Sequence, residues 1–525
     1  MARTALFGVL GPFVGAALAA VGCEATVIYI ETAAGTTTIT TTNSTTTSAS
    51  GGAGGALLCA PGATQPCYSG PAGTEGQGIC TAGAEVCAAD GMSWGACSGE
   101  VLPAVEDCAT AEDEDCDGIA PPCKGELLWA KRFGDVEDQA ALAVAQDTEG
   151  HIYLTGRFHG TTDFGGEAHV SSGGSDAFVA KLDALGGYVW SKSFGDGLDQ
   201  TGSALSVGAG GLVITGSFDG LMDLGGGQLA SAGGMDVFVA KLDTSGSHIW
   251  SRSFGGPGSD DGSAVILDAA GDVFVSGSFH GAIDFGGGAL KAAGVTPAMF
   301  LAKLDGADGH HVWSKSFGNG VASARAETEN GIVVAGSAYG PVNFGAGTVM
   351  VLGVQPFAAA FDSFGGYAWG RVFQGNAVVG ATAVADERVF LVGSYFSTVD
   401  FGGGPLPSSA LGSIFLAELG PNGAHSWSKP LSDGDGRAVA ADAKGRVVAA
   451  GANGPGSLYL SKFGLGGDLI WNQDASSSAS QAMSVSLDDS GSAILAGYFA
   501  GTLGLGGVTL VSAGAGDVLV AKFGP

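Results

Sequence analysis

The stretch KLDTSGSHIWSRSFGG, which runs from Lys241 to Gly256, decides the fold. It contains two β-rich runs separated by a Ser- and Gly-rich turn, the pattern of a β-hairpin whose second strand carries a Trp. Near-copies recur down the chain, but GELLWAKRFG, from Gly125, lacks the front half, and VLVAKFGP, ending at Pro525, lacks the back half. We therefore predict that Leu127–Phe133 pairs with Val518–Phe523, which would rebuild one hairpin from the two fragments and leave no unpaired inner edge there.

The hairpin is one part of a repeat that fills the chain from Leu127 onward. Its Trp residues are 44 to 63 positions apart by subtraction, which gives seven units: Trp129, Trp190, Trp250, Trp313, Trp369, Trp427 and Trp471. One unit contains four β-rich segments, WSKSFG, SALSVGAGG, LVITGSFDG and DVFVAKLD, and no segment has helical periodicity. The pattern predicts an all-β fold, a seven-bladed β-propeller over residues 125–525 closed by pairing of its terminal strands. An open β-solenoid is the alternative, but it has no reason to divide a hairpin between the two ends.

Several recurring residues are assigned to this architecture. The aspartates of the Asp-x-x-Gly turns at Asp147, Asp268, Asp442 and Asp488 are expected to cap turns, with Gly supplying positive φ. The tryptophans and the Phe of the Asp-Phe-Gly-Gly segments, including the variant Asn-Phe-Gly-Ala at Phe344, are expected to pack between blades (Phe164, Phe285, Phe344, Phe401). Neither Asp-Phe-Gly nor the Gly runs indicate a kinase or a phosphate site, because their partner motifs and a following helix are missing.

Composition restricts the partners of the chain. Its 525 residues include 51 Asp and Glu against 21 Lys and Arg, for a formal charge of −30. This balance argues against nucleic acid and against nonspecific adsorption to an anionic membrane, because both need clustered cations.

The N-terminus predicts export. Residues 1–22 contain one Arg, an apolar run from Ala5 to Val21 and small residues, as a signal peptide does. The end of the run, Ala20-Val21-Gly22-Cys23, resembles the bacterial lipobox, with Ala20 in place of the usual Leu. That resemblance implies cleavage before Cys23 and lipidation of its sulfur and amino group; the alternative is an ordinary cleaved signal. Residues 23–58, rich in Thr, Ser and Gly, are predicted to form a flexible tether.

Residues 59–124 predict a small, acidic, disulfide-rich module. All cysteines lie at or before Cys123, and without Cys23 an even set is left: Cys59, Cys67, Cys80, Cys87, Cys97, Cys108, Cys116 and Cys123. Such a set in a Gly- and Pro-rich segment indicates four disulfides in an oxidising compartment, with the pairing left open.

The same module contains a candidate Ca²⁺ site. Asp113, Asp115 and Asp117, followed by Gly118, have the spacing of the first half of a calcium-binding loop. A full loop also needs a distal carboxylate, whereas Lys124 occupies the twelfth position. The alternative is a solvated acidic face on a disulfide-bonded core.

A second candidate site is the set of residues that follow the central strand of successive blades: His159, Asp219, His280, Tyr339 and Phe396. They are expected on one face, where His and Asp side chains bind metals or act as acid and base. The alternative, that they are variable strand-end residues, is favoured because equivalent positions in a ring lie far apart.

Two parts of the chain resemble known families. AQDTEGHIYLTG (Ala145–Gly156) and AFVAKLDALG (Ala177–Gly186) resemble the bacterial β-propeller repeat of secreted and surface proteins. Pro61–Cys87 and Glu106–Gly118 resemble the Cys-rich region of lipoproteins of myxobacterial type, whose second half is described as a metal-binding motif. The resemblance implies fold and envelope location, and little about the ligand, because propellers host many unrelated functions.

The sequence thus predicts a lipid-anchored protein of the outer membrane or cell surface, monomeric, whose propeller is a binding platform for a protein or glycan. No catalytic activity is expected, and no cofactor apart from Ca²⁺ is implied. One alternative is a propeller enzyme, either a quinoprotein-like oxidoreductase or a glycan-cleaving enzyme, the latter needing two carboxylates at a defined separation. Another is an outer-membrane assembly scaffold.

Overall fold

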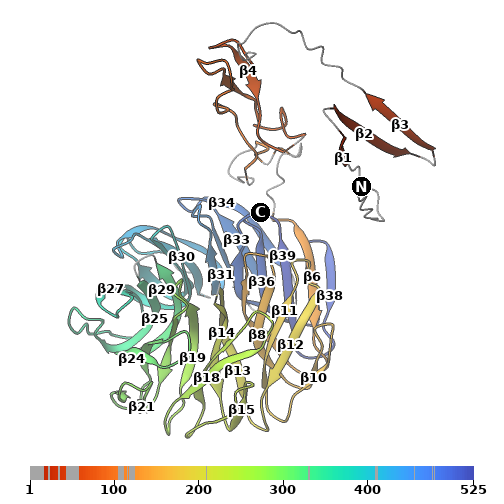
Figure 1. Ribbon diagram of the computed structural model, residues 1–525. Helices are drawn as coiled ribbons and strands as arrows, with labels where there is room; N and C mark the ends of the chain where they lie inside the picture. The colour runs from red at the N-terminus through yellow and green to blue at the C-terminus, as the bar shows by residue number, and fades with distance from the viewer. Residues whose placement is uncertain are drawn as a thin grey trace. The chain divides into compact units, whose positions relative to one another are not determined.

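The computed structural model describes residues 17–21, 24–33, 36–42, 58–71, 73–104, 112–114, 116, 125–208, 210–328, 331–407, 412–454, 456–475, 477 and 479–525 (Figure 1). In these ranges the regular structure consists of β-strands. None of the described segments forms a helix with the length and apolarity to span a membrane.

The chain divides into two compact parts, which are distinct from the repeat units described below. One contains residues 1–67 and 84–98, and the other contains residues 68–83 and 99–525. The predicted Cys-rich module, residues 59–124, therefore contributes to both.

Three short strands precede the cysteines: β1 (Ala17–Val21), β2 (Glu24–Ala33) and β3 (Thr36–Thr42). They form an antiparallel sheet in the order β1-β2-β3. The structure thus differs from a uniformly flexible tether over residues 24–42. The physical reason is the high content of β-branched Thr, Ile and Val, which favour extended strands. Cys23 lies outside the described residues.

Disulfides hold the Cys-rich segments. The structure contains Cys59–Cys87, Cys67–Cys97 and Cys80–Cys116. Strands β4 (Thr64–Cys67) and β5 (Gly83–Val86) pair with each other in a two-stranded sheet. Cys108 and Cys123 lie outside the described residues.

The repeat region is built from four-stranded antiparallel units. Three of these are separate sheets. The first, in spatial order, contains β7 (Gln139–Gln146), β8 (Ile152–Phe158), β11 (Asp176–Leu182) and β12 (Tyr188–Phe194). The second contains β13 (Gln200–Gly208), β14 (Gly211–Phe218), β17 (Asp236–Leu242) and β18 (His248–Phe254). The third contains β35 (Ala479–Leu487), β36 (Ala493–Ala500), β39 (Asp517–Phe523) and β6 (Leu127–Phe133).

Two further sheets have seven strands each, because one long strand belongs to two units. One sheet contains β19 (Asp261–Leu267), β20 (Val273–Phe279), β23 (Ala298–Leu304), β24 (His311–Thr328), β25 (Gly331–Val342), β26 (Gln355–Asp362) and β27 (Tyr367–Val372). The other contains β28 (Gln374–Ala385), β29 (Arg388–Asp400), β30 (Ser413–Leu419), β31 (His425–Ala441), β32 (Val447–Asn453), β33 (Ser457–Phe463) and β34 (Leu469–Ala475). The first part of β24 and of β31 is the outer strand of one unit, and the second part is the inner strand of the next.

Short hairpins connect the second and third strands of several units. They are β9 (Thr161–Thr162) with β10 (His169–Val170), β15 (Leu221–Asp223) with β16 (Gln228–Ala230), β21 (Ala282–Ile283) with β22 (Leu290–Lys291), and β37 (Thr502–Leu505) with β38 (Val508–Val511).

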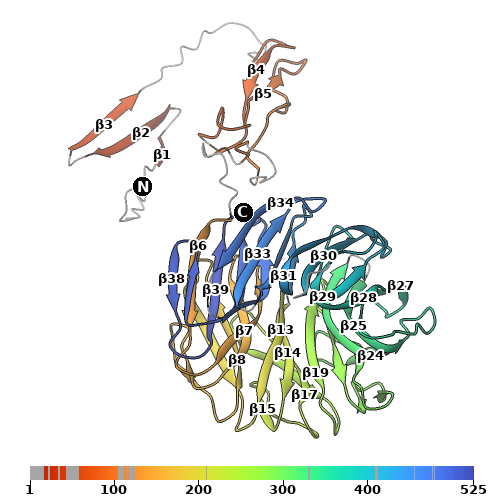
Figure 2. The same ribbon diagram turned by 180° about the vertical axis from the view of Figure 1, so that it is seen from behind.

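The two ends of the repeat region meet in one sheet. Strand β39 pairs antiparallel with β6, with Val518 opposite Phe133 and Ala521 opposite Ala130 (Figures 1 and 2). The predicted pairing of Leu127–Phe133 with Val518–Phe523 is therefore present. Arg132 of β6 also donates to the buried carboxylate of Asp517 at 2.6 Å.

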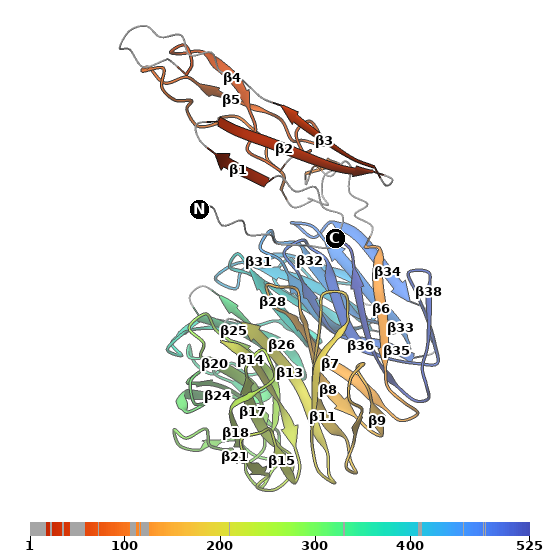
Figure 3. The ribbon, with the colours of Figure 1, turned by 45° about the vertical axis from the view of Figure 1, so that its right-hand side comes forward.

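The first strand of each unit contacts the first strand of the next. This holds from β7 through β13, β19, β24, β28, β31 and β35, and β35 contacts β7. Figure 3 shows β7 and β8 beside β35 and β36. Contacts therefore link the neighbouring first strands throughout this series.

The hydrophobic core lies between neighbouring units. Tyr153 and Val179 of the first unit cluster with Phe218 and Phe238 of the second. The predicted packing role of the Asp-Phe-Gly-Gly phenylalanines is confirmed: Phe164 lies 5.0 Å from Phe133 and 4.9 Å from Phe178 between ring centroids. Phe285, Phe344 and Phe401 make the equivalent contacts.

The tryptophans also contact the next unit, as predicted. A Cβ placed on Gly309 would lie 2.6 Å from the ring of Trp250, so the indole packs directly on the glycine backbone. The Trp250 Nε1–H donates to the Gly306 carbonyl at 3.1 Å. The same stacking pairs Trp129 with Gly186, Trp190 with Gly246, Trp313 with Gly365, Trp369 with Gly423, Trp427 with Gly467 and Trp471 with Gly125.

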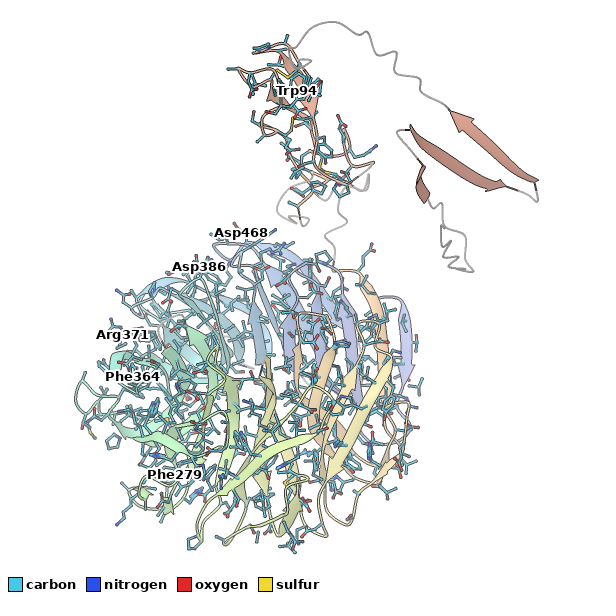
Figure 4. The ribbon with its side chains drawn as sticks, viewed as in Figure 1. Trp94, Phe279, Phe364, Arg371, Asp386 and Asp468 are labelled. Carbon is cyan, nitrogen blue, oxygen red and sulfur yellow. A yellow bond between two sulfur atoms is a disulfide. The ribbon has the colours of Figure 1, made fainter. Side chains whose placement is uncertain are left out.

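The Asp-x-x-Gly turns have the structural role predicted for them. The Oδ1 atoms of Asp147, Asp268, Asp442 and Asp488 each accept a backbone N–H four residues on, at 2.7–2.9 Å. These turns define one end of the units, here called the turn end, where Asp386 and Asp468 also lie (Figure 4). The opposite end, called the far end, is where β8, β14 and β20 finish at Phe158, Phe218 and Phe279.

Candidate functional site

A β-bulge occurs at the equivalent position of every inner strand. The extra residue is Leu142 in β7, Ser203 in β13, Ser263 in β19, Gly380 in β28, Arg437 in β31 and Met483 in β35, and β24 has the same shift between Ala322 and Ala324. A bulge bends its strand and re-aims one side chain, and bulges are frequent beside functional sites.

The bulged residues meet at one cavity. A hollow of about 450 Å³ is lined by Leu142, Ser203, Ser263, Gly380, Arg437 and Met483, with their strand neighbours. Its volume is in the usual range for small-ligand sites. We call this hollow the central channel.

Hydrogen bonds between inner strands fix the channel wall. The Ser484 hydroxyl accepts the Val144 N–H at 3.1 Å, and the Ser206 hydroxyl accepts the Leu267 N–H at 3.2 Å. Each bond joins two units, so these serine side chains tie the inner strands together.

Arg437 is the charged residue among the described residues of the channel wall. Its Nε donates to Oδ2 of Asp435 at 2.6 Å, and the Gln481 amide donates to the same oxygen at 3.3 Å. The Ser394 hydroxyl donates to Oδ1 of Asp435 at 2.8 Å, and the Tyr498 hydroxyl donates to Gln481 at 3.1 Å. This network, here called the Asp435 network, joins three units near the far end and holds the guanidinium at the channel.

The far end also contains carboxylates whose pKa is raised. Desolvation raises the pKa of Asp176, at the start of β11, to about 6. The same cause raises the pKa of Asp236 and of Asp260. Asp176 is 3% exposed, and the Ser172 N–H reaches it at 3.3 Å, which only partly offsets burial. These side chains cap strand starts and do not line the channel.

The predicted calcium ligands are described only in part. Asp113 is buried, and its backbone carbonyl accepts the Ile79 N–H at 3.1 Å. Asp115 and Asp117 lie outside the described residues. The Ca²⁺ site thus stays a prediction.

The predicted set at the strand ends does not converge on one group. The His159 N–H donates to the Asp138 carbonyl, and the His280 ring nitrogen Nδ1 lies 2.7 Å from the Ser259 carbonyl oxygen. Asp219 accepts the Gly220 N–H at 2.9 Å. The side chains of Tyr339 and Phe396 are 38% and 60% exposed, and partial desolvation raises the pKa of Tyr339. Among the described residues, these side chains form no shared metal-ligand group.

The bulge positions and the Asp435 network were not predicted from the sequence. A signal exists, because most bulges have small residues on both sides, as in Gly202-Ser203-Ala204, Gly262-Ser263-Ala264 and Gly436-Arg437-Ala438. Within that pattern Arg437 is the large charged exception.

No protein-family model matches the chain, and no curated protein matches it. Solved structures do match. The structure of the Dos1 propeller aligns with a TM-score of 0.40 and 10% identity, over 76% of this chain and 96% of that one. The Neurospora crassa Pan2 WD40 domain aligns with a TM-score of 0.29 and 10% identity, over 76% and 98%. The NanB sialidase from Streptococcus pneumoniae aligns with a TM-score of 0.31 and 9% identity, over 77% and 71%.

Proposed function

We propose that the chain is an exported, lipid-anchored protein of the cell envelope, whose repeat region is a closed seven-bladed β-propeller that binds a glycan in its central channel. The protein acts as a monomeric binding platform without a catalytic step. The observation that carries the proposal is the convergence of one bulge residue from each of six inner strands on a single polar hollow.

The sheet topology supports the ring. Each of the three four-stranded sheets is one unit. Each of the two seven-stranded sheets contains two units that share a strand, which gives seven units in all. The Trp–Gly contacts run in one direction from unit to unit, and Trp471 on Gly125 together with Trp129 on Gly186 completes the circuit through the unit that contains β6. Contact of β35 with β7 agrees with a closed ring.

The lining favours a hydroxyl-rich ligand. Ser203 and Ser263 supply hydroxyls, Arg437 supplies N–H donors, and Leu142 and Met483 supply apolar contact. A wall that combines placed hydrogen-bonding groups with apolar side chains is typical of a small-ligand site. Sugars present hydroxyls on their edges and C–H groups on their faces, which fits this mixture.

The Arg437→Ala variant tests the ligand site. Loss of the guanidinium should weaken binding to the strongest ligand of a glycan array at least tenfold, because hydrogen bonds to a charged donor contribute about 1.5–3 kcal/mol each. Arg252→Ala is the matched control, because this arginine lies on an outer strand and donates to the Asp308 carbonyl. Absence of any glycan ligand, with capture of a protein instead, would contradict the glycan assignment. Equal loss in both variants would contradict the channel site.

The Cys23→Ala variant tests the anchor. Without the thiol that carries the lipid, the protein should move from the membrane fraction to the soluble fraction, since acyl chains supply the membrane affinity. Fractionation of cells followed by immunoblotting measures this. Unchanged fractionation would count against lipidation at Cys23.

A further inference from the structure

The inner turn of the first unit differs from its equivalents. Its Asp-x-x-Gly turn continues to His151, where the other turns have Asp272, Arg446 and Ser492. Asp272 forms an ion pair with Lys303, and Arg446 with the aspartate of its own turn. His151 instead faces two carboxylates.

The distances in this turn match a metal coordination shell. His151 Nδ1 lies 3.0 Å from Asp147 Oδ2 and 3.5 Å from Glu149 Oε2, and one ligand atom from each residue lies within 4.8 Å of the others. A tetrahedral ion with bonds of about 2.0–2.1 Å separates its ligands by about 3.3 Å. The two short distances are close to that value.

The surroundings supply space and a second oxygen donor. A cavity of about 350 Å³ is lined by this turn and by Asp488 and Asp489 of the neighbouring inner turn. Gln146 lines the same cavity, and its buried Oε1 accepts no hydrogen bond from the described residues. An ordered water in this cavity would give that oxygen a donor.

Other contacts of Asp147 limit the geometry. Its Oδ1 accepts two backbone N–H groups of the turn, at 3.1 and 2.9 Å, so Oδ2 is the ligand atom. The Tyr153 hydroxyl donates to Oδ2 at 3.1 Å, which holds the carboxylate in place. Lys181 Nζ lies 3.8 Å from Oδ2 and opposes a cation there. Asp488 is itself paired with Lys522 at 3.1 Å, so the carboxylates of Glu149 and Asp489 are the ones that offset Lys181.

We propose that Asp147, Glu149 and His151 bind one divalent first-row transition ion, of which Zn²⁺ is the best fit, at the turn end beside the channel. Imidazole with carboxylates suits Zn²⁺, whereas Ca²⁺ and Mg²⁺ take oxygen ligands. The site is independent of the glycan-binding proposal, because the Asp435 network lies at the far end.

Isothermal titration calorimetry of the full chain with Zn²⁺, in the presence of millimolar Mg²⁺, tests the site. One ion should bind with micromolar affinity or better. His151→Ala and Glu149→Gln should each weaken that affinity at least tenfold, and the visible absorption that Co²⁺ gives in a tetrahedral site should be present in the unchanged chain and lost in both variants. The Glu149 side chain is 79% exposed, so its substitution leaves folding intact.

His310→Ala is the matched control. This histidine pairs with Asp308 at 2.7 Å on an exposed turn but has no third ligand in the described structure. Its loss should leave Zn²⁺ affinity unchanged. Equal affinity in all four proteins, equal weakening by His310→Ala, or no binding below millimolar Zn²⁺ would each overturn the proposal.

Discussion

Removal of Gly125–Phe133 is expected to lower the melting temperature by about 10 °C or more, although these residues stand at one end of the repeat region. The deletion strips β6 from β39, leaves the edge of β39 unpaired and removes Phe133 and Trp129 from contacts with the first unit. It also leaves the buried Asp517 carboxylate without Arg132. Arg132 is itself 34% exposed, so its loss costs less than the about 3–5 kcal/mol of breaking a fully buried ion pair. Thermal unfolding followed by circular dichroism measures the effect.

Deletion of residues 35–56 is the control for this truncation. It removes more residues, but none of them belongs to the repeat region. Its melting temperature should match that of the intact chain. Equal melting of the two truncated proteins would defeat the ring account.

Trp250→Ala is expected to lower the free energy of unfolding by about 3–5 kcal/mol. The indole is 6% exposed, packs on Gly309 and donates to Gly306 of the next unit. Gly309→Ala should also destabilise, because the residue has φ of +74° and its new Cβ would lie 2.6 Å from the Trp250 ring. Denaturant unfolding of both single variants and the double variant gives the coupling between them.

This double-mutant cycle separates the contribution of the Trp250–Gly309 contact to stability from that of backbone strain at Gly309. In the Trp250→Ala background, Gly309→Ala should destabilise by about 1–2 kcal/mol less than in the intact chain, since the clash is gone and the positive φ is left. Ile249→Ala, at a 44% exposed position on the same strand, should change stability by less than about 1 kcal/mol. Strict additivity of the two substitutions would show that the indole does not pack on Gly309.

The architecture was predictable where one residue type recurs for one physical reason. Trp250 and its equivalents recur because each stacks on a glycine of the next unit, and Asp268 and its equivalents recur because each caps a turn. Strands β2 and β3 were not predicted, because low hydrophobicity favours disorder in this segment whereas the β preference of Thr favours strands. The shared strands β24 and β31 were also missed, since no turn signal marks a strand that serves two units.

The candidate site was less predictable, because it depends on three-dimensional convergence. Ser203 and Arg437 are far apart in sequence, and they meet at the channel only in the folded chain. His151 was not predicted as a ligand, because the role of Asp147 as a turn residue accounts for this segment without a metal ion. The hairpin residues of Lys241–Gly256, by contrast, build units and leave the ligand unspecified.

The most direct test of the closed ring is a disulfide engineered across the terminal strand pair. Ala130 and Ala521 are register partners on β6 and β39, so Ala130→Cys with Ala521→Cys places two thiols opposite each other. The account predicts near-complete crosslinking of the folded protein, identified by mass spectrometry of the peptide pair, and a higher melting temperature before reduction than after it. Two thiols that stay free and react with an alkylating reagent in the folded protein would contradict it.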